Sequence, residues 1–158
     1  MSGHSEIVHI LLIEDNEGDI FLLARALEHA AFHHRLTVLQ DGADAMSFLR
    51  RDFSSEPDSR PDLVLLDLNL PRVEGSKILE LFRTSSVLQS IPVVLLSSST
   101  APRDSAKASL LNHCIYIAKP SDLDAYMEIG FQVKAFWEQC RRECEQSQSV
   151  SVLHPADT

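Results

Sequence analysis

The chain has 158 residues, 44% of them hydrophobic, which is the size of one ordinary domain with a buried core. Its 14 basic and 23 acidic residues give a formal net charge of −9, which disfavours binding to nucleic-acid phosphates. Its apolar runs are much shorter than the roughly 20 residues of a membrane span, and residues 1–6 lack the features of an export signal. We therefore expect a cytoplasmic domain with neither a nucleic-acid partner nor a membrane segment.

Apolar runs of strand length alternate along the chain with segments of helical spacing. The runs are continuous, as in strands that are covered on both faces. In chain order they are Val8–Ile13, Arg35–Leu39, Leu63–Leu66, Ile91–Leu96 and Cys114–Ala118. Helical spacing of apolar residues follows each run. It occurs at Ile20, Leu23, Leu27 and Ala30, at Ala45, Phe48 and Leu49, at Ile78, Leu81 and Phe82, at Ala106, Leu110 and Leu111, and from Leu123 to about Cys144.

Five strands that alternate with five helices imply parallel pairing through right-handed crossovers. We therefore predict an α/β fold with a doubly wound, five-stranded parallel sheet and helices on both faces. Residues 51–61 and the Ser/Gln-rich tail after Glu145 are predicted to be loops or disordered. The expected domain covers residues 1–145, and residues 146–158 form a tail.

Polar residues stand at the ends of four of the five apolar runs. They are Glu14 and Asp15, Asp67, Ser97 and Ser98, and Lys119. Ligands of such sheets bind beyond the carboxyl ends of the strands, where these side chains would meet. A lone Asp after a strand is commonly a helix cap, but capping does not explain the whole set. Two like charges about 4 Å apart repel by about 4 kcal/mol at an effective dielectric near 20, and a hard cation such as Mg²⁺ would relieve that repulsion.

The segment LLDLNLPRVEG, residues 65–75, places a reactive group at this edge. Asp67 ends a buried strand, and Asn69 and Pro71 turn the chain before the next helix. Carboxylates can act as nucleophiles that form acyl phosphates. Asp67 is therefore the candidate nucleophile.

These positions together resemble the receiver domain of two-component response regulators, from about Val8 to Glu143. The matching residues are Glu14 and Asp15, then Asp67 with Asn69, Pro71 and Gly75, then Ser97, Tyr116 and the pair Lys119-Pro120. The resemblance implies a flavodoxin-like sheet with strand order 2-1-3-4-5. It also implies that the domain catalyses only its own phosphorylation and dephosphorylation and is not otherwise an enzyme.

The resemblance assigns a role to each matching residue. Asp67 would accept a phosphoryl group from a histidine kinase, and Lys119 would pair with Asp67 at rest and with the phosphoryl group afterwards. Pro120 would follow a cis peptide bond. The expected Mg²⁺ ligands are Asp15, Asp67, the backbone carbonyl of Asn69 and, through water, Glu14. Ser97 and Tyr116 would form the switch that reports phosphorylation.

Glu17 and Asp19 follow Glu14 and Asp15 so closely that they extend the acidic run. We interpret them separately, because acids are favoured at the positive end of a helix dipole. In this interpretation, replacing Asp15 abolishes Mg²⁺ binding, whereas replacing Asp19 costs mainly stability.

A finer resemblance is to the single-domain regulators that partner phytochrome-type, light-sensing histidine kinases. It rests on the acidic run of residues 14–19 and on Phe136-Trp137 in the last helix. Many of those regulators have Pro at the position of Glu17 and Thr at the position of Ser97. The partner implied is a histidine kinase, with a bacterial phytochrome as the specific candidate.

Only 39 residues follow Lys119, which leaves no room for an effector domain in this chain, so we expect output through protein contacts. The last helix is apolar on more than one face, with Leu123, Met127 and Phe131 on one side. We hypothesise a two-fold homodimer through this helix and the surface of the fourth helix and fifth strand. The tail could reach the other subunit as an arm or remain a frayed terminus.

Three alternatives remain open at this stage. A phosphatase of the haloacid dehalogenase type also uses a strand-end Asp, but it requires a second Asp where this chain has Asn69. An adaptor could keep the receiver fold without being phosphorylated. A flavodoxin-like nucleotide binder is disfavoured because the chain lacks glycine-rich phosphate-binding motifs.

Overall fold

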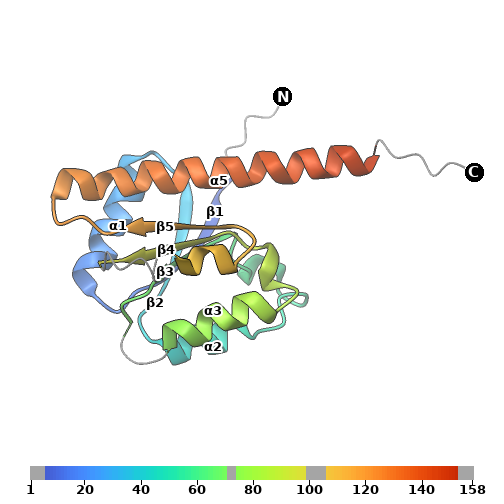
Figure 1. Ribbon diagram of the computed structural model, residues 1–158, viewed down its shortest axis with the longest axis horizontal. Coiled ribbons are helices and arrows are strands. Elements are labelled where there is room, and N and C mark those ends of the chain that lie inside the picture. Colours follow the sequence, from blue (N-terminus) through green and yellow to red (C-terminus); the bar gives the residue numbers. More distant parts are fainter. Residues whose placement is uncertain (1–5, 71–73, 99–105, 153–158) are drawn as a thin grey trace, which may run out of the picture.

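The computed structural model describes residues 6–70, 74–98 and 106–152. Five parallel strands form one sheet in the order β2-β1-β3-β4-β5, as expected. The strands are β1 Val8–Ile13, β2 His34–Leu39, β3 Leu63–Asp67, β4 Val93–Ser97 and β5 Cys114–Ala118. Figure 1 shows the sheet between two helical layers, with α5 above it and α2 and α3 below it.

Four α-helices lie in the described part of the chain. They are α1 Glu17–His29, α2 Gly42–Leu49, α3 Glu74–Thr84 and α5 Leu123–Val152. The prediction of five helices is therefore wrong for the described residues. The expected fourth segment appears there as a 3-10 helix, Lys107–Leu110, which ends where Leu111 adopts extended backbone; residues 99–105 lie outside the description. Shorter 3-10 turns also occur at Pro57–Ser59 and Leu88–Ser90.

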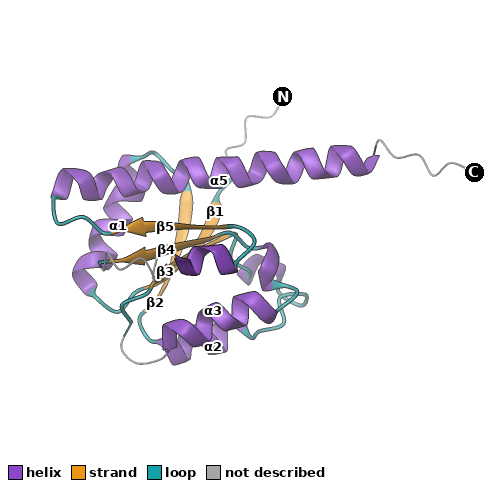
Figure 2. Cartoon of the chain, viewed as in Figure 1, coloured by secondary structure: helices purple, strands orange, loops and turns teal. Residues whose placement is uncertain are grey.

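Two hydrophobic cores explain why the strands are continuously apolar. Successive side chains of a strand point to opposite faces of the sheet. In β1, Ile10 and Leu12 belong to the core between the sheet and helices α1 and α5. Leu11 and Ile13 belong to the core between the sheet and helices α2 and α3. Both faces are thus buried, as parallel sheets require. Figure 2 shows the strands enclosed by helices in this way.

The last helix is longer than the sequence predicted. Residues after Glu145 were expected to be loop-like, but α5 continues as a helix to Val152. No Gly or Pro interrupts residues 131–152, so local sequence does not stop the helix. At 30 residues it is about 45 Å long at 1.5 Å per residue, and it projects beyond the sheet. Within the described ranges, no helix combines the length and the hydropathy needed to span a bilayer.

Candidate functional site

The carboxyl ends of four strands bring the predicted polar residues together. Asp67 and Ser97 are the last residues of β3 and β4, Glu14 follows β1, and Lys119 follows β5. Backbone bonds align these ends: the Lys119 amide donates to the Ser97 carbonyl at 2.8 Å, and the Leu68 amide donates to the Leu96 carbonyl at 2.8 Å. The strands therefore hold these side chains at one edge of the sheet, where Glu14, Asp67 and Lys119 line a hollow of about 610 Å³.

Three carboxylates form the acidic centre of this hollow. Each of Glu14, Asp15 and Asp67 offers an oxygen, and these oxygens lie within 4.8 Å of one another. Glu14 is 0% exposed and Asp67 2% exposed, whereas Asp15 is open to solvent. A set of carboxylate oxygens with an open side suits a hard divalent cation, which usually keeps several waters. The residues present therefore fit a metal of this class.

Lys119 is shared by three carboxylates. Its Nζ donates to Glu14 Oε2 at 2.7 Å and to Asp19 Oδ2 at 3.1 Å, and it lies 3.4 Å from Asp67 Oδ1. The expected pairing with Asp67 is thus present, but Glu14 is the nearer partner. The side chain of Lys119 is only 6% exposed, so these interactions are little screened by water.

The expected cis peptide before Pro120 is not found, because the described residues contain no cis peptide bond. Lys119 directly follows β5, and with a trans bond its ammonium already reaches Glu14 and Asp19. Aiming the lysine into the hollow therefore does not require the cis form in this structure.

Burial and crowding change the acid–base behaviour of the site. Burial, together with the neighbouring Asp67, raises the pKa of Glu14 to about 7, although the hydrogen bond from Lys119 opposes this rise. Burial alone would lower the pKa of Lys119, but its bond to Glu14 and the charges of Asp67 and Glu14 outweigh burial and raise it. The lysine is therefore held in its charged form, and Glu14 takes up a proton near neutral pH in the absence of a cation.

Asn69 and Ser98 line the hollow near Asp67, and the buried Ser97 lies beside them. The Asn69 amide donates to Asp67 Oδ1 at 2.9 Å, which fixes one carboxylate oxygen. The Asn69 side chain accepts from Ser97 Oγ at 3.3 Å and donates to Ser98 Oγ at 2.8 Å. Tyr116 lies half-buried on β5 against the core beneath α2 and α3. The two proposed switch residues therefore lie on neighbouring strands, β4 and β5.

Asp19 has side-chain partners in the site that the sequence did not indicate. It does lie in the first turn of α1, where Asn16 caps the helix by accepting from the Asp19 amide at 2.9 Å. Its carboxylate, however, also accepts from Lys119 and from the hydroxyl of Tyr126, at 3.0 Å. The predicted helix-end position of Asp19 is therefore confirmed, but its carboxylate also belongs to the charged cluster around Lys119. A signal was available, because Tyr126 is the one hydroxyl in the stripe Tyr126, Ile129, Val133 and Phe136, and a buried tyrosine hydroxyl needs a partner.

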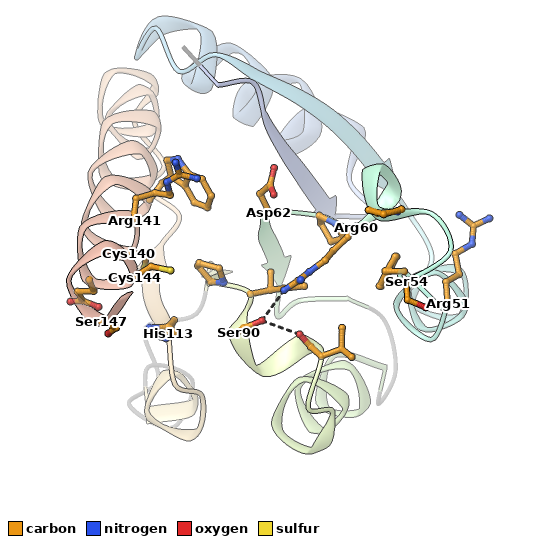
Figure 3. Close-up of a pocket in the computed structure, with 18 of the residues that line it drawn as sticks. Arg51, Ser54, Arg60, Asp62, Ser90, His113, Cys140, Arg141, Cys144 and Ser147 are labelled. Atoms are coloured by element: carbon orange, nitrogen blue, oxygen red, sulfur yellow. Dashed lines mark hydrogen bonds between the residues drawn. The ribbon is translucent and has the colours of Figure 1, made fainter. Parts of the chain in front are cut away.

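A second and larger hollow of about 1000 Å³ lies at the opposite edge of the sheet (Figure 3). Its lining includes Arg60 and Asp62 before β3, His113 before β5, and Cys140 and Arg141 on α5. Arg60 donates to Ser90 Oγ at 2.7 Å across its floor. Because it faces the amino ends of the strands, it is separate from the acidic hollow.

The family of the chain follows from comparison with known proteins. Residues 10–129 match the model of the response regulator receiver domain, which is most of the chain. The chain belongs to the receiver domain family. It is therefore a response regulator domain of two-component signalling, and this excludes the phosphatase and nucleotide-binder alternatives.

Three relatives show where in the family this receiver lies. It is 34% identical over 128 residues to response regulator Rcp1 of Synechocystis, covering 81% of this chain and 87% of that protein. It is 36% identical over 128 residues to the probable methanogenesis regulatory protein FilR2 of Methanothrix harundinacea, covering 81% and 82%. The phosphorylated cyanobacterial phytochrome response regulator RcpA, a solved structure, is 37% identical with a TM-score of 0.72, covering 84% of this chain and 94% of that one.

One of the similar structures was solved with a divalent cation bound. Rcp1 has been solved in a Mn²⁺-bound form, which has a TM-score of 0.70, 34% identity and coverage of 82% of this chain and 94% of that one. Together with the cluster of Glu14, Asp15 and Asp67, this supports binding of a divalent cation by this receiver.

Proposed function

We propose that Asp67 of this receiver accepts a phosphoryl group from a phosphohistidine of its kinase. The observation that carries the proposal is the placement of a nearly buried Asp67 at the end of β3, beside the Lys119 ammonium and the carboxylates of Glu14 and Asp15. A nucleophilic carboxylate, a fixed cation and an acidic cation site are the parts that phosphoryl transfer needs.

Phosphoryl transfer from the kinase to Asp67 is a single displacement at phosphorus. A carboxylate oxygen of Asp67 forms the new P–O bond while the P–N bond to the kinase imidazole breaks, and the electron pair of that bond returns to the ring nitrogen. Lys119 then offsets negative charge on the phosphoryl oxygens, and Asn69 N–H keeps the other Asp67 oxygen in place. Dephosphorylation ends the signal: water attacks the same phosphorus, the P–O bond to Asp67 breaks, and inorganic phosphate and the free Asp67 carboxylate are released.

We propose Mg²⁺ as the physiological cation, held by Asp15, Asp67 and the Asn69 carbonyl, with Glu14 acting through water. Mg²⁺ is typically bound by one or two carboxylates together with substrate phosphate, and it would supply further charge neutralisation. The donor set is made of oxygen atoms, which agrees with this choice.

Ser97 and Tyr116 are the proposed switch. In the structure Ser97 Oγ donates to Asn69, so a phosphoryl oxygen on Asp67 would compete for this hydroxyl. Movement of Ser97 on β4 would change the position of Tyr116 on β5, because the two strands are paired. The local charge change thereby reaches the surface around β5.

Incubation with Mg²⁺ and acetyl phosphate tests the phosphoacceptor proposal. Intact-mass measurement should show one added phosphoryl group that survives acid and is lost in base, and Asp67→Asn should abolish it. Asp58→Asn is a matched control, because Asp58 is an exposed acid in the 3-10 turn Pro57–Ser59. An unmodified wild-type protein would support the non-phosphorylated adaptor instead, and an adduct retained by Asp67→Asn would contradict the assignment.

We further propose a phytochrome-type histidine kinase as the partner. Support comes from the similarity to Rcp1 and to RcpA, which is a phytochrome response regulator, although FilR2 is equally similar. Phosphotransfer from a purified phytochrome-type kinase should be faster than from unrelated kinases at equal concentration. Equal rates from all kinases would contradict this partner.

We also propose that the output is made through a homodimer, which forms through the surface of the fourth-helix segment, β5 and α5. Its support is the length of α5, which extends past the domain, and the exposure of Leu123 (59%) at its start. The exposed apolar surface on α5 is smaller than the sequence indicated, because Met127 packs on the core and Phe131 contacts His29 of α1. Residues 146–152 then extend the dimer contact as part of the helix.

A further inference from the structure

A chain of hydrogen bonds links α5 to the phosphoacceptor site. Tyr126, in the first turns of α5, is 4% exposed, and its hydroxyl donates to Asp19 Oδ1 at 3.0 Å. The other oxygen of the same carboxylate, Oδ2, accepts from Lys119 Nζ at 3.1 Å. Asp19 therefore gives one oxygen to the helix and one to the lysine.

Both ends of this link are held by rigid backbone. Asp19 lies in the first turn of α1, where its own amide is fixed by the Asn16 cap. Tyr126 lies where α5 begins, and the Tyr126 amide donates to the Asp122 carbonyl at 2.9 Å. Between two fixed helix starts, the carboxylate has little freedom, so a change on the lysine side reaches the tyrosine side.

We propose that Asp19 and Tyr126 are positioning residues of the phosphoacceptor site: Tyr126 orients the Asp19 carboxylate, Asp19 holds the Lys119 ammonium, and the start of α5 responds to the position of that ammonium. This rests on the proposed phosphorylation of Asp67. A phosphoryl group adds charge and strong acceptor oxygens, which attract Lys119 away from Asp19 or together with it. In either case the bond to Tyr126 is disturbed, and the signal reaches α5 without passing through Ser97 and Tyr116.

The competing explanation is that Asp19 merely satisfies a buried hydroxyl. In that case its removal changes stability but not the response of α5 to phosphorylation. The chain offers a direct reporter, since its single tryptophan, Trp137, lies on α5 and packs on the core beneath it. Trp137 lies 11 positions along the helix from Tyr126, so it reports the helix rather than the site.

The experiment compares Tyr126→Phe and Asp19→Asn with the wild-type protein. Glu17→Gln is the matched control, because it removes an acid from the same first turn of α1 at an exposed position. Each protein is treated with Mg²⁺ and acetyl phosphate; intact mass gives the rate and extent of phosphorylation, and fluorescence gives the change at Trp137. Asp19→Glu tests rescue, since it restores a carboxylate.

We expect Tyr126→Phe and Asp19→Asn to be phosphorylated on Asp67, up to roughly tenfold more slowly, as when an orienting partner is removed from a catalytic group. At equal extent of phosphorylation, their Trp137 change should fall below half of the wild-type change. Glu17→Gln should keep the full change, and Asp19→Glu should recover part of it. A Trp137 response that is absent in the wild type, retained in both variants or equally lost in Glu17→Gln would overturn the proposal.

Failure of the proposed function has a different signature. If the wild type is not phosphorylated, the link is tested at rest by a double-mutant cycle of unfolding free energies with Lys119→Met and Tyr126→Phe. These two residues interact through Asp19, so their effects should be non-additive. Additive effects would remove the link itself, whatever the fate of the phosphorylation proposal.

Discussion

Glu14 shows how a single buried acid can couple cation binding to protons. It is 0% exposed, and burial with the adjacent Asp67 raises its pKa to about 7. A carboxylate must lose its proton before it can assist a cation. In the proposed site, the proton and the cation would therefore compete at Glu14 near neutral pH.

We predict that the affinity for Mg²⁺ falls as pH drops from about 8 to about 6, because the proton occupies Glu14 below its pKa. Isothermal titration calorimetry in buffers of different ionisation enthalpy should show proton release on binding near pH 7. Glu14→Gln removes the titrating group and should flatten the dependence. An affinity that is constant over this range in the wild type would contradict the prediction.

His9 is a second buried titratable residue, at the opposite edge of the sheet. Its Nδ1 lies 3.1 Å from the Arg60 carbonyl and its Nε2 lies 2.8 Å from Thr37 Oγ1. These bonds suit the neutral ring, in which Nδ1–H donates and Nε2 accepts. Burial, with the charge of Arg35, lowers the pKa of His9, although the Arg60 carbonyl and Asp62 oppose this.

The sign of the resulting pH dependence follows from this lowered pKa. In the unfolded chain His9 takes up a proton at a pKa of about 6.5, whereas in the folded protein its pKa is lower. The contribution of His9 to folding stability is therefore fully present above about pH 6.5 and is lost as the pH falls further. Urea unfolding should show this loss, and His9→Gln should reduce the slope below about pH 6.5. Equal slopes in the wild type and His9→Gln would refute the assignment.

At the scale of elements, the contact between α1 and α5 depends on one glycine. An added Cβ at Gly130 would overlap the Ala26 carbonyl of α1 and also press on Ala30. One turn later, Lys134 Nζ donates to the Ala30 carbonyl at 3.2 Å, where positive charge is favoured at the end of α1. The close crossing thus holds α5 against α1 one turn after Tyr126, which contacts the site through Asp19.

Gly130→Ala should lower the free energy of unfolding by about 1–3 kcal/mol, the usual cost of overpacking, even though Ala is the better helix former. Chemical denaturation would measure it. Gly75→Ala is the control, since a Cβ there makes ordinary van der Waals contact in α3 and should be neutral or slightly stabilising. A Gly130→Ala protein as stable as the wild type would mean that the helices separate without cost.

At the scale of the whole molecule, α5 determines the shape of the protein. The first half of the helix covers the sheet with Tyr126, Ile129, Val133 and Phe136. The second half continues past the amino edge of the sheet, beside the hollow drawn in Figure 3. A helix that leaves its own domain offers a surface for contact with another protein.

Sedimentation of the full chain and of a chain cut after Glu145 tests the proposed dimer. We expect the full chain to sediment as a dimer and the shortened chain to shift toward monomer, because the cut removes the last turns of the projecting helix. If both chains are monomers, the dimer does not exist. If both are equally dimeric, residues after 145 contribute nothing to it.

The sequence by itself determined the order of strands and helices, the parallel sheet and the set of residues at the strand ends. This was possible because strand and helix leave different hydrophobic periods, and because parallel strands bring their carboxyl ends to one edge. The sequence alone could therefore predict that five residues lie at one edge of the sheet: Asp67, Glu14, Asp15, Ser97 and Lys119. The helix boundaries were less certain, as the extension of α5 to Val152 shows, because propensity alone rarely stops a helix that lacks Gly and Pro.

Only the tertiary structure decided which carboxylates contact the Lys119 ammonium and that Asp19 is one of them. Two residues 100 positions apart meet at 3.1 Å because the first turn of α1 and the end of β5 converge, and no local pattern encodes that distance. In the sequence, Asp19 was interpreted as a helix-end acid, and no pattern linked it to Tyr126. Their hydrogen bond arises from the close α1–α5 crossing at Gly130, a packing contact that becomes visible only when both helices are in place.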